Sequence, residues 1–415
     1  MADIAGLPYY ELTFTADGTL SMDGGLPAAV SGGGITDLFV FSHGWNSSVG
    51  NARGLYQAMF TLLARMLGPK LSTSAAVGVL WPSLLFPEDD PSTPDTPSTG
   101  AQLAEALALA LPDKKQSLTA MGTMLDQQPQ DSAQLQQFHQ LASGLVTTPA
   151  LAPEDEGPQA AITGDTSAVF GHAAAMAKTP AAGAEGLPNP FKTMWSGARE
   201  VLRTMSYYEM KNRGGVIGQK GLGPLLAKLA PAGSPLRIHL MGHSFGARLV
   251  SFSLTGLPDT AVGDASPIKS LTLIQGAFSH FSFANPTPCK AVPSGALAGV
   301  LNRVDGPLLS TFTSADRAVG WWYPTASTLA HQNAQSLTDL TYEWGGMGHD
   351  GFQQSPAGTT VELQAQGHDY VFTKGSVYLL DSNKIIHANQ SAFSGAHSDI
   401  RHPEVAWAVL SAASV

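Results

Sequence analysis

The segment Gly242-His243-Ser244-Phe245-Gly246 has a serine between two glycines in a G-x-S-x-G pattern. In a chain with 44 glycines, so short a pattern arises easily by chance, and the residues around it decide its meaning. A mostly apolar segment at 236–241 (LRIHLM), which predicts a buried strand, precedes it, and a segment with a helical pattern at 247–254 follows. A serine at a sharp strand-to-helix turn projects its Oγ above the sheet edge, where it can act as a nucleophile. The alternative interpretation is a serine in an ordinary tight turn.

A second motif that can take part in chemistry, Ser-His-Gly-Trp-Asn at 42–46, directly follows the apolar run 38–41. When a serine attacks a carbonyl, negative charge develops on the oxygen, and backbone N–H groups aimed at that oxygen stabilise it. The candidate donors are the backbone N–H groups of Trp45 and of Phe245, the residue after the serine. Gly44 lets this loop lie close to the site, and we interpret His43 as an orienting residue rather than a proton carrier.

The elements around these motifs are short apolar runs that alternate with helical patterns. Strands are predicted at residues 9–15, 35–42, 75–81, 236–241, 268–275, 308–313 and 377–380. Helical patterns occupy residues 52–67, 101–111, 132–145, 191–205 and 222–229. This alternation is typical of an α/β fold with a mostly parallel central sheet flanked by helices.

More than 150 residues separate the strand ending at Trp81 from the strand before Ser244. Within this stretch, residues 147–190 are rich in Pro, Ala and Gly, a composition that predicts partial flexibility. We interpret residues 87–190 as a long helical and loop insertion in one catalytic domain spanning residues 1–415. The insertion is either a lid over the site or a surface decoration.

A strand followed by HGWN, with a distant G-x-S-x-G elbow, resembles the α/β-hydrolase superfamily. HGWN together with a strand ending in Trp81-Pro82-Ser83 is similar to a bacterial branch of poorly characterised esterase/lipase-like hydrolases, which have HG-aromatic-Asn and Trp-Pro-Ser at these places. The resemblance covers residues 38–83 and roughly residue 236 to the C-terminus, but not the insertion. It implies the α/β-hydrolase fold and the chain order nucleophile, acid, histidine.

The resemblance implies that the acid follows the next-but-one strand after the elbow, which is the run at 308–313. Asp316 comes just after this run, whereas Asp305 precedes it. Asp339 and Asp350 lie in a later polar segment. We therefore assign Asp316 as the acid, with a turn-capping carboxylate as the alternative.

The resemblance also implies a histidine in the loop between the last strand and the last helix. His397 follows a loop of mostly small residues at 391–396 and is the preferred base. His402 precedes Pro403, which is expected to begin the terminal helix, and His387 lies close to the end of the last strand. Both stay open as alternatives.

These residues predict a serine hydrolase that cleaves a carboxylic ester through an acyl-enzyme on Ser244. A serine peptidase or amidase is the alternative, because the same three groups can cleave amides. A non-catalytic binding protein that kept the fold is a third interpretation. The expected substrate is a small-molecule or lipid-like acyl compound, and its candidate pocket residues are Phe278, Phe281, Trp321 and Trp322.

Composition excludes other classes of function. The chain has 22 Lys and Arg against 32 Asp and Glu, a net charge of −10, which argues against nucleic acid as a partner. Apolar runs stay well below the roughly 18 residues of a membrane span.

The expected location of the protein follows from two observations. Residues 1–20 do not have the pattern of a signal peptide, and the single Cys289 cannot form an internal disulfide, so we expect a cytoplasmic protein. The 12 histidines have no metal-ligand spacing, so no metal or other cofactor is predicted. The oligomeric state does not follow from the sequence.

Overall fold

The computed structural model describes residues 2–83, 86–87, 98–151, 158–177, 190–288, 293–322, 345–353, 357–389 and 394–415. Its strands are β1 (Ala2–Ile4), β2 (Leu7–Phe14), β3 (Leu20–Met22), β4 (Asp37–Ser42), β5 (Ser74–Leu80), β6 (Arg237–His243), β7 (Ile268–Ile274), β8 (Leu308–Phe312), β9 (Thr359–Glu362) and β10 (Val377–Asp381). Its α-helices are α1 (Leu26–Ser31), α2 (Val49–Met66), α3 (Gly100–Ala108), α4 (Lys115–Gln127), α5 (Ser132–Ser143), α6 (Pro158–Thr163), α7 (Thr166–Ala177), α8 (Pro190–Val216), α9 (Gly223–Leu229), α10 (Phe245–Ser253), α13 (Met347–Asp350) and α14 (Pro403–Ala413).

The strands form one sheet in the order β1-β2-β5-β4-β6-β7-β8-β10-β9, with β3 paired to β2. Only β1 and β3 run antiparallel to their neighbour β2. From β4 the chain moves outward to β5 and then returns to β6 on the other side of β4. In parallel α/β sheets, ligands bind at such a reversal of strand order, beside the carboxyl ends of the strands. The loops after β4 and β6 are therefore the expected place for a site.

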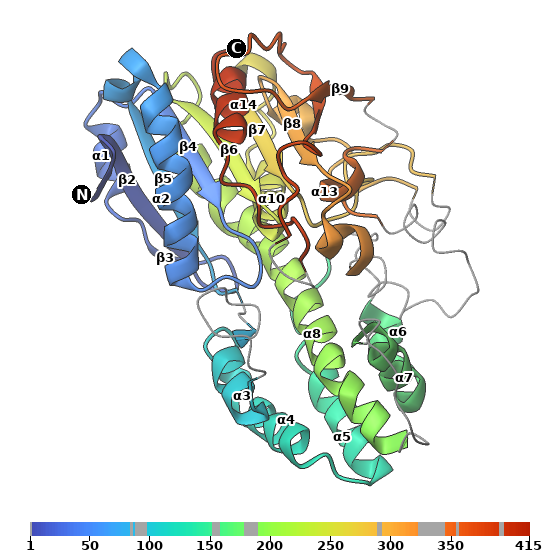
Figure 1. Cartoon of the computed structure of the whole chain (residues 1–415). Helices are drawn as coiled ribbons and strands as arrows, with labels where there is room; N and C mark the ends of the chain where they lie inside the picture. The colour runs from blue at the N-terminus through green and yellow to red at the C-terminus, as the bar shows by residue number, and fades with distance from the viewer. Residues whose placement is uncertain are drawn as a thin grey trace.

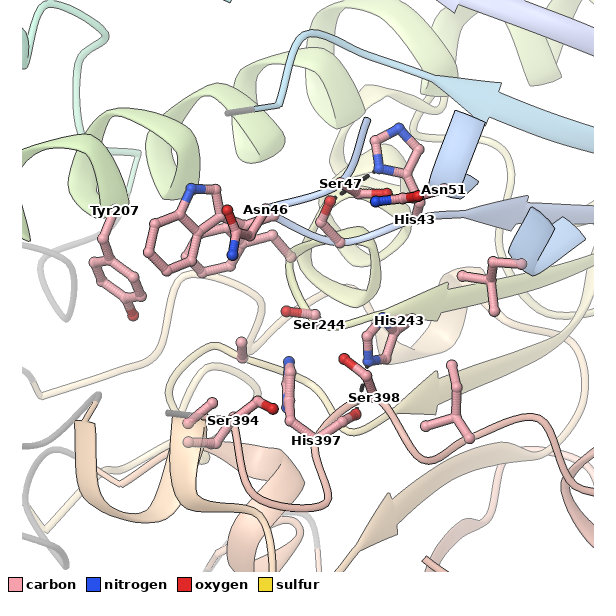
Figure 2. Close-up of a pocket in the computed structure, with 18 of the residues that line it drawn as sticks. His43, Asn46, Ser47, Asn51, Tyr207, His243, Ser244, Ser394, His397 and Ser398 are labelled. Atoms are coloured by element: carbon pink, nitrogen blue, oxygen red, sulfur yellow. Dashed lines mark hydrogen bonds between the residues drawn. The ribbon is translucent and has the colours of Figure 1, made fainter. Parts of the chain in front are cut away.

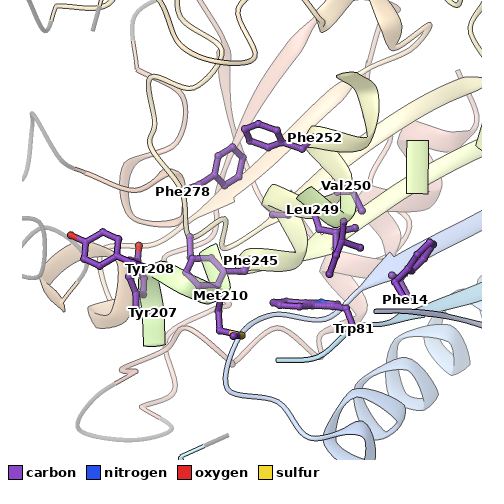
Figure 3. Packing of buried hydrophobic residues seen from close by; sticks show 14 of the residues in the cluster. Phe14, Trp81, Tyr207, Tyr208, Met210, Phe245, Leu249, Val250, Phe252 and Phe278 are labelled. Carbon is purple, nitrogen blue, oxygen red and sulfur yellow. The ribbon is translucent and has the colours of Figure 1, made fainter. Parts of the chain in front are cut away.

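Helices cover both faces of the sheet, so the central strands are apolar on both sides. Along β4, Leu38 and Val40 join the core on one face, and Phe39 and Phe41 join the core on the other. This alternation is the ordinary period of a strand. Helices α2 and α14 pack together on the second face, and α8 and α10 lie on the first (Figure 1). Between α8, α10 and the sheet, large side chains such as Tyr207, Phe245 and Trp81 fill the core (Figure 3).

The described residues between β5 and β6 are largely helical. Helices α3 to α7 gather around the part of α8 that extends beyond the sheet (Figure 1). A buried ion pair on α8 helps to anchor this assembly: Glu209 accepts hydrogen bonds from Thr148 and binds Arg213 at 3.1 Å. Arg213 donates to the carbonyls of Pro82 and Ala110, which precede and follow α3. Helices α6 and α7 lie within the tract 147–190, and the partial flexibility of that tract stays a prediction.

The sequence patterns located the main strands but missed several elements. Helix α4 and strand β9 were not predicted. Strand β9 runs parallel to β10. No helix in the described ranges has both the length and the apolar character that crossing a bilayer requires.

Candidate active site

Ser244 lies at a strained turn between β6 and α10. Its φ of 58° and ψ of −123° are rare for a residue with a side chain, and such strain is common at functional sites. The flanking glycines permit the turn, because a Cβ on Gly246 would collide with the carbonyl oxygens of Ser42 and His43. The Ser244 N–H donates to the Ile274 carbonyl at 3.1 Å, which fixes the turn against β7.

The HGWN loop and the Trp-Pro-Ser segment hold each other. The indole N–H of Trp81 donates to the His43 carbonyl at 3.0 Å, and the two rings stack with centroids 5.3 Å apart. The Ser83 hydroxyl donates to the Ser47 carbonyl at 2.6 Å. Asn46, with a left-handed φ of 57°, accepts a hydrogen bond from the Phe86 N–H through its side chain. The two motifs therefore form one unit at the ends of β4 and β5.

His43 orients the peptide between Gly44 and Trp45. Its Nδ1 lies 2.9 Å from the Gly44 carbonyl oxygen. Nδ1 is therefore protonated and donates a hydrogen bond to that oxygen. In a trans peptide the C=O and N–H groups point in opposite directions, so the Trp45 N–H points away from the His43 side chain. Burial lowers the pKa of the His43 imidazole to about 4. A ring that is neutral at physiological pH and bonded to a carbonyl suits the orienting role proposed for His43, not that of a proton carrier.

Asp316 and His397 form a buried pair. The Nδ1 of His397 lies 2.7 Å from Oδ2 of Asp316, and the exposed side-chain fractions are 10% and 0%. The two loops that carry them pair as a short antiparallel bridge between Asp316 and Gly395, in which the Ala396 N–H donates to the Ala315 carbonyl. Because the Nδ1–H group of His397 donates a hydrogen bond to Asp316, the Nε2 atom of His397 is left with a lone pair.

His243 connects the serine turn to the histidine loop. Its Nε2 lies 2.9 Å from the His397 carbonyl oxygen, and the two rings are 4.9 Å apart. Burial, with the nearby His397 as a smaller cause, lowers the pKa of His243 to about 3. The neutral ring donates a hydrogen bond from Nε2–H to that carbonyl. His243, the residue before the serine, therefore fixes the backbone of His397.

Ser244 and His397 face one cavity of about 180 Å³ (Figure 2). In this view an imidazole nitrogen of His397 points toward Ser244. Trp45 and Phe245, the two predicted oxyanion donors, also line the cavity. As the first residue of α10, Phe245 has a backbone N–H with no acceptor inside its own helix. The structure thus brings together the five residues that the sequence analysis assigned to catalysis and the oxyanion hole.

The predicted pocket residues lie elsewhere or outside the described part. Phe278 and Phe281 are buried and do not line the cavity. The ring of Phe278 packs on Phe283, and Phe281 packs on His280, because the chain after β7 turns into the core. The side chains of Trp321 and Trp322 lie outside the described residues. The pocket positions that the sequence analysis missed include Asn46, Ser47, Asn51, Leu55, Tyr207 and Ile400.

The alternative acid and base residues are engaged in other contacts. Asp305 binds Lys269 at 2.7 Å at the other end of the sheet, ahead of β8. His402 precedes α14 and lies 2.9 Å from Asp399, and Asp399 also accepts the His387 N–H. Neither His402 nor His387 lines the cavity that contains Ser244. Asp339 lies outside the described residues, and Asp350 pairs with His280.

Acid should weaken the fold through His43. The folded-state pKa of about 4 lies below the usual value near 6.5, so between these values only the unfolded chain binds the proton. Stability should therefore fall as the pH drops through this window, by about 3 kcal/mol in total. Urea unfolding at pH 7, 6, 5 and 4 measures the slope of the free energy of unfolding against pH. His43→Gln should make this slope shallower but not flat, because the buried His243, with a pKa of about 3, adds a loss of stability in the same direction. Replacement of the exposed His172 should leave the slope as it is. An unchanged slope in His43→Gln would contradict the assignment.

No protein-family model matches the chain, and no curated protein or solved structure is detectably similar to it. Among the described residues, no three His, Cys, Asp or Glu side chains gather in a way that could hold a metal ion.

Proposed function

We propose that this chain is a serine hydrolase with an α/β-hydrolase fold that cleaves carboxylic esters through an acyl-enzyme on Ser244. The observation that carries the proposal is the strained Ser244 turn in the same cavity as the buried His397–Asp316 pair. The position of this cavity, at the reversal of strand order between β4 and β6, supports the same conclusion.

In the proposed reaction, His397 Nε2 takes the proton of Ser244 as Oγ attacks the ester carbonyl. The backbone N–H groups of Trp45 and Phe245 stabilise the oxyanion. Asp316 keeps His397 in the Nδ1–H tautomer and stabilises its protonated form. The C–O bond to the alcohol then breaks, and His397 protonates the departing oxygen. A water molecule, deprotonated by the same histidine, attacks the acyl-enzyme and releases the acid.

Two assays on the folded protein test this proposal. A fluorophosphonate probe should label Ser244, as mapped by mass spectrometry, and short and long p-nitrophenyl esters should be hydrolysed. Absence of labelling would overturn the proposal. Faster turnover of a matched anilide than of the ester would instead favour a peptidase or amidase.

Gly44→Ala should impair the proposed oxyanion hole. A Cβ at residue 44 would lie 2.5 Å from Ser244 Cβ and 3.0 Å from Oγ, so the HGWN loop or the serine must move. Loss of one oxyanion donor lowers kcat roughly 10²- to 10³-fold, and we expect a fall of this order with little change in KM. Gly54→Ala is the matched control, because no atom lies within 4 Å of its added Cβ. Equal esterase activity in the two variants would contradict the role of Gly44.

A further inference from the structure

Gln275, the first residue after β7, lies behind the proposed catalytic pair. It is completely buried, and its φ of 46° is left-handed. A buried residue other than glycine keeps such a backbone only where its surroundings hold it, and such positions cluster at functional sites. No motif in the sequence drew attention to this residue.

The polar groups of Gln275 are bonded to three other segments of the chain. Its side-chain Nε2 donates to Asp316 Oδ2 at 3.0 Å and to the Gly348 carbonyl at 2.9 Å. Its Oε1 accepts from the Thr311 hydroxyl at 2.9 Å, and its backbone N–H donates to the same hydroxyl at 2.9 Å. A carboxylate and a carbonyl only accept, whereas a hydroxyl can donate. These partners therefore allow one orientation of the amide, with the nitrogen toward Asp316.

The amide is fixed from both sides. Thr311 belongs to β8, the strand that leads into the Asp316 loop. On the opposite side, Gly348 of α13 lies so close that a Cβ there would be 2.8 Å from Gln275 Cα. The Gly348 carbonyl also accepts the Thr313 N–H at 3.0 Å. Another rotamer of the Gln275 side chain would break its hydrogen bonds to Asp316, Gly348 and Thr311.

The side-chain carboxylate of Asp316 accepts hydrogen bonds from three donors among the described residues. Its Oδ2 accepts from His397 and Gln275, and its Oδ1 accepts from the Val319 N–H at 3.0 Å. Two donors on one oxygen fix the direction from which His397 can approach the carboxylate. Any rotation of the carboxylate would lengthen both hydrogen bonds to Oδ2.

We propose that Gln275, anchored by Thr311, is the positioning residue that holds Oδ2 of Asp316 toward His397. This inference rests on the proposed function, because it assigns Gln275 a role in activating Ser244 through the Asp316–His397 pair. Gln275 does not line the cavity, so it acts through Asp316 and not on the substrate.

The test measures the second-order rate at which a fluorophosphonate probe phosphonylates Ser244 across pH 5 to 9. In this step the Ser244 Oγ–P bond forms, fluoride leaves and His397 takes the serine proton. Gln275→Met keeps the size of the side chain and removes both donors. Loss of a hydrogen bond to a charged group predicts a rate roughly 10- to 100-fold lower.

Gln275→Glu gives a readout that a purely structural role would not produce. The new carboxyl faces Asp316, and two adjacent carboxyl groups share one proton until the pH rises. The protonated form can still donate to Oδ2, whereas the doubly ionised pair repels. The rate in this variant should therefore fall as the pH rises from about 6 to 9, a range in which we expect no such decline in the unmodified protein. Because the comparison is made within one variant, a lower yield of folded protein does not change the shape of the profile.

Two threonine variants serve as a matched pair. Thr311→Val removes the anchor and should lower the rate, whereas Thr272→Val removes a buried hydroxyl that has no hydrogen-bond partner among the described residues and should not. Equal rates in the two threonine variants would overturn the inference, and so would a pH profile of Gln275→Glu that matches the profile of the unmodified protein. In either case, labelling of Ser244 in the unmodified protein would still support the proposed function. Absence of labelling in the unmodified protein would overturn both.

Discussion

Ser244→Ala is expected to lower the rate of ester hydrolysis by about 10⁴-fold or more, because removal of a serine nucleophile eliminates the covalent route. Phosphonylation by a fluorophosphonate probe should disappear at the same time. Both effects follow from the same atom, since Oγ is the group that attacks carbon in the ester and phosphorus in the probe. Steady-state kinetics with p-nitrophenyl butyrate and mass spectrometry of the labelled peptide measure them.

Ser251→Ala is the matched control for this variant. Ser251 lies on α10, the helix that follows Ser244, is fully buried, and donates its hydroxyl to the Ala247 carbonyl of that helix. Its loss should leave the rate and the labelling close to those of the unmodified protein. Ester hydrolysis that survives in Ser244→Ala at the level of the Ser251→Ala control would exclude Ser244 as the nucleophile.

The parts of the fold that could be predicted from sequence are those with a local signal. β4, β5, β6 and β7 are buried on both faces, so each appears as a mostly apolar run bounded by turns, although β6 and β7 include polar residues such as His239 and Lys269. The serine turn also has a local signal, because a Cβ on Gly242 would collide with Gly246 of the same strand–turn–helix unit. Asp316 and His397 lie 81 positions apart and have no local signal. They were assigned through the chain order that the resemblance implies.

The residues that escaped prediction depend on packing between distant segments. Tyr207 lies in the C-terminal half of the 27-residue helix α8, and its place in the cavity depends on the angle at which α8 crosses the sheet. Gln275 is bonded to Gly348, 73 positions away. Phe278 and Phe281 were expected in the pocket because they follow β7, but the loop turns them into the core. None of the described residues from 98 to 177 lines the cavity, so the lid stays a prediction.

His397→Ala should lower kcat by about 10⁴-fold, comparable to loss of the nucleophile, because serine and base act as a unit. Without the imidazole, Ser244 keeps its proton and the leaving alcohol receives none. KM should change little, since His397 is one side chain among many that line the cavity. Stopped-flow or steady-state hydrolysis of p-nitrophenyl esters measures the split between kcat and KM.

His402→Ala is the decisive comparison, because His402 is also a histidine paired with an aspartate close to the same loop. Its Nε2 lies 2.9 Å from Asp399 Oδ1, but it does not line the cavity of Ser244. Loss of His402 should alter the stability of the fold, because His402 is bonded to Asp399, which also accepts the His387 N–H. It should leave kcat nearly unchanged. A large fall of kcat in His402→Ala with normal activity in His397→Ala would reverse the assignment of the base. The same result would also remove the role of Asp316, whose Oδ2 is bonded to His397 at 2.7 Å.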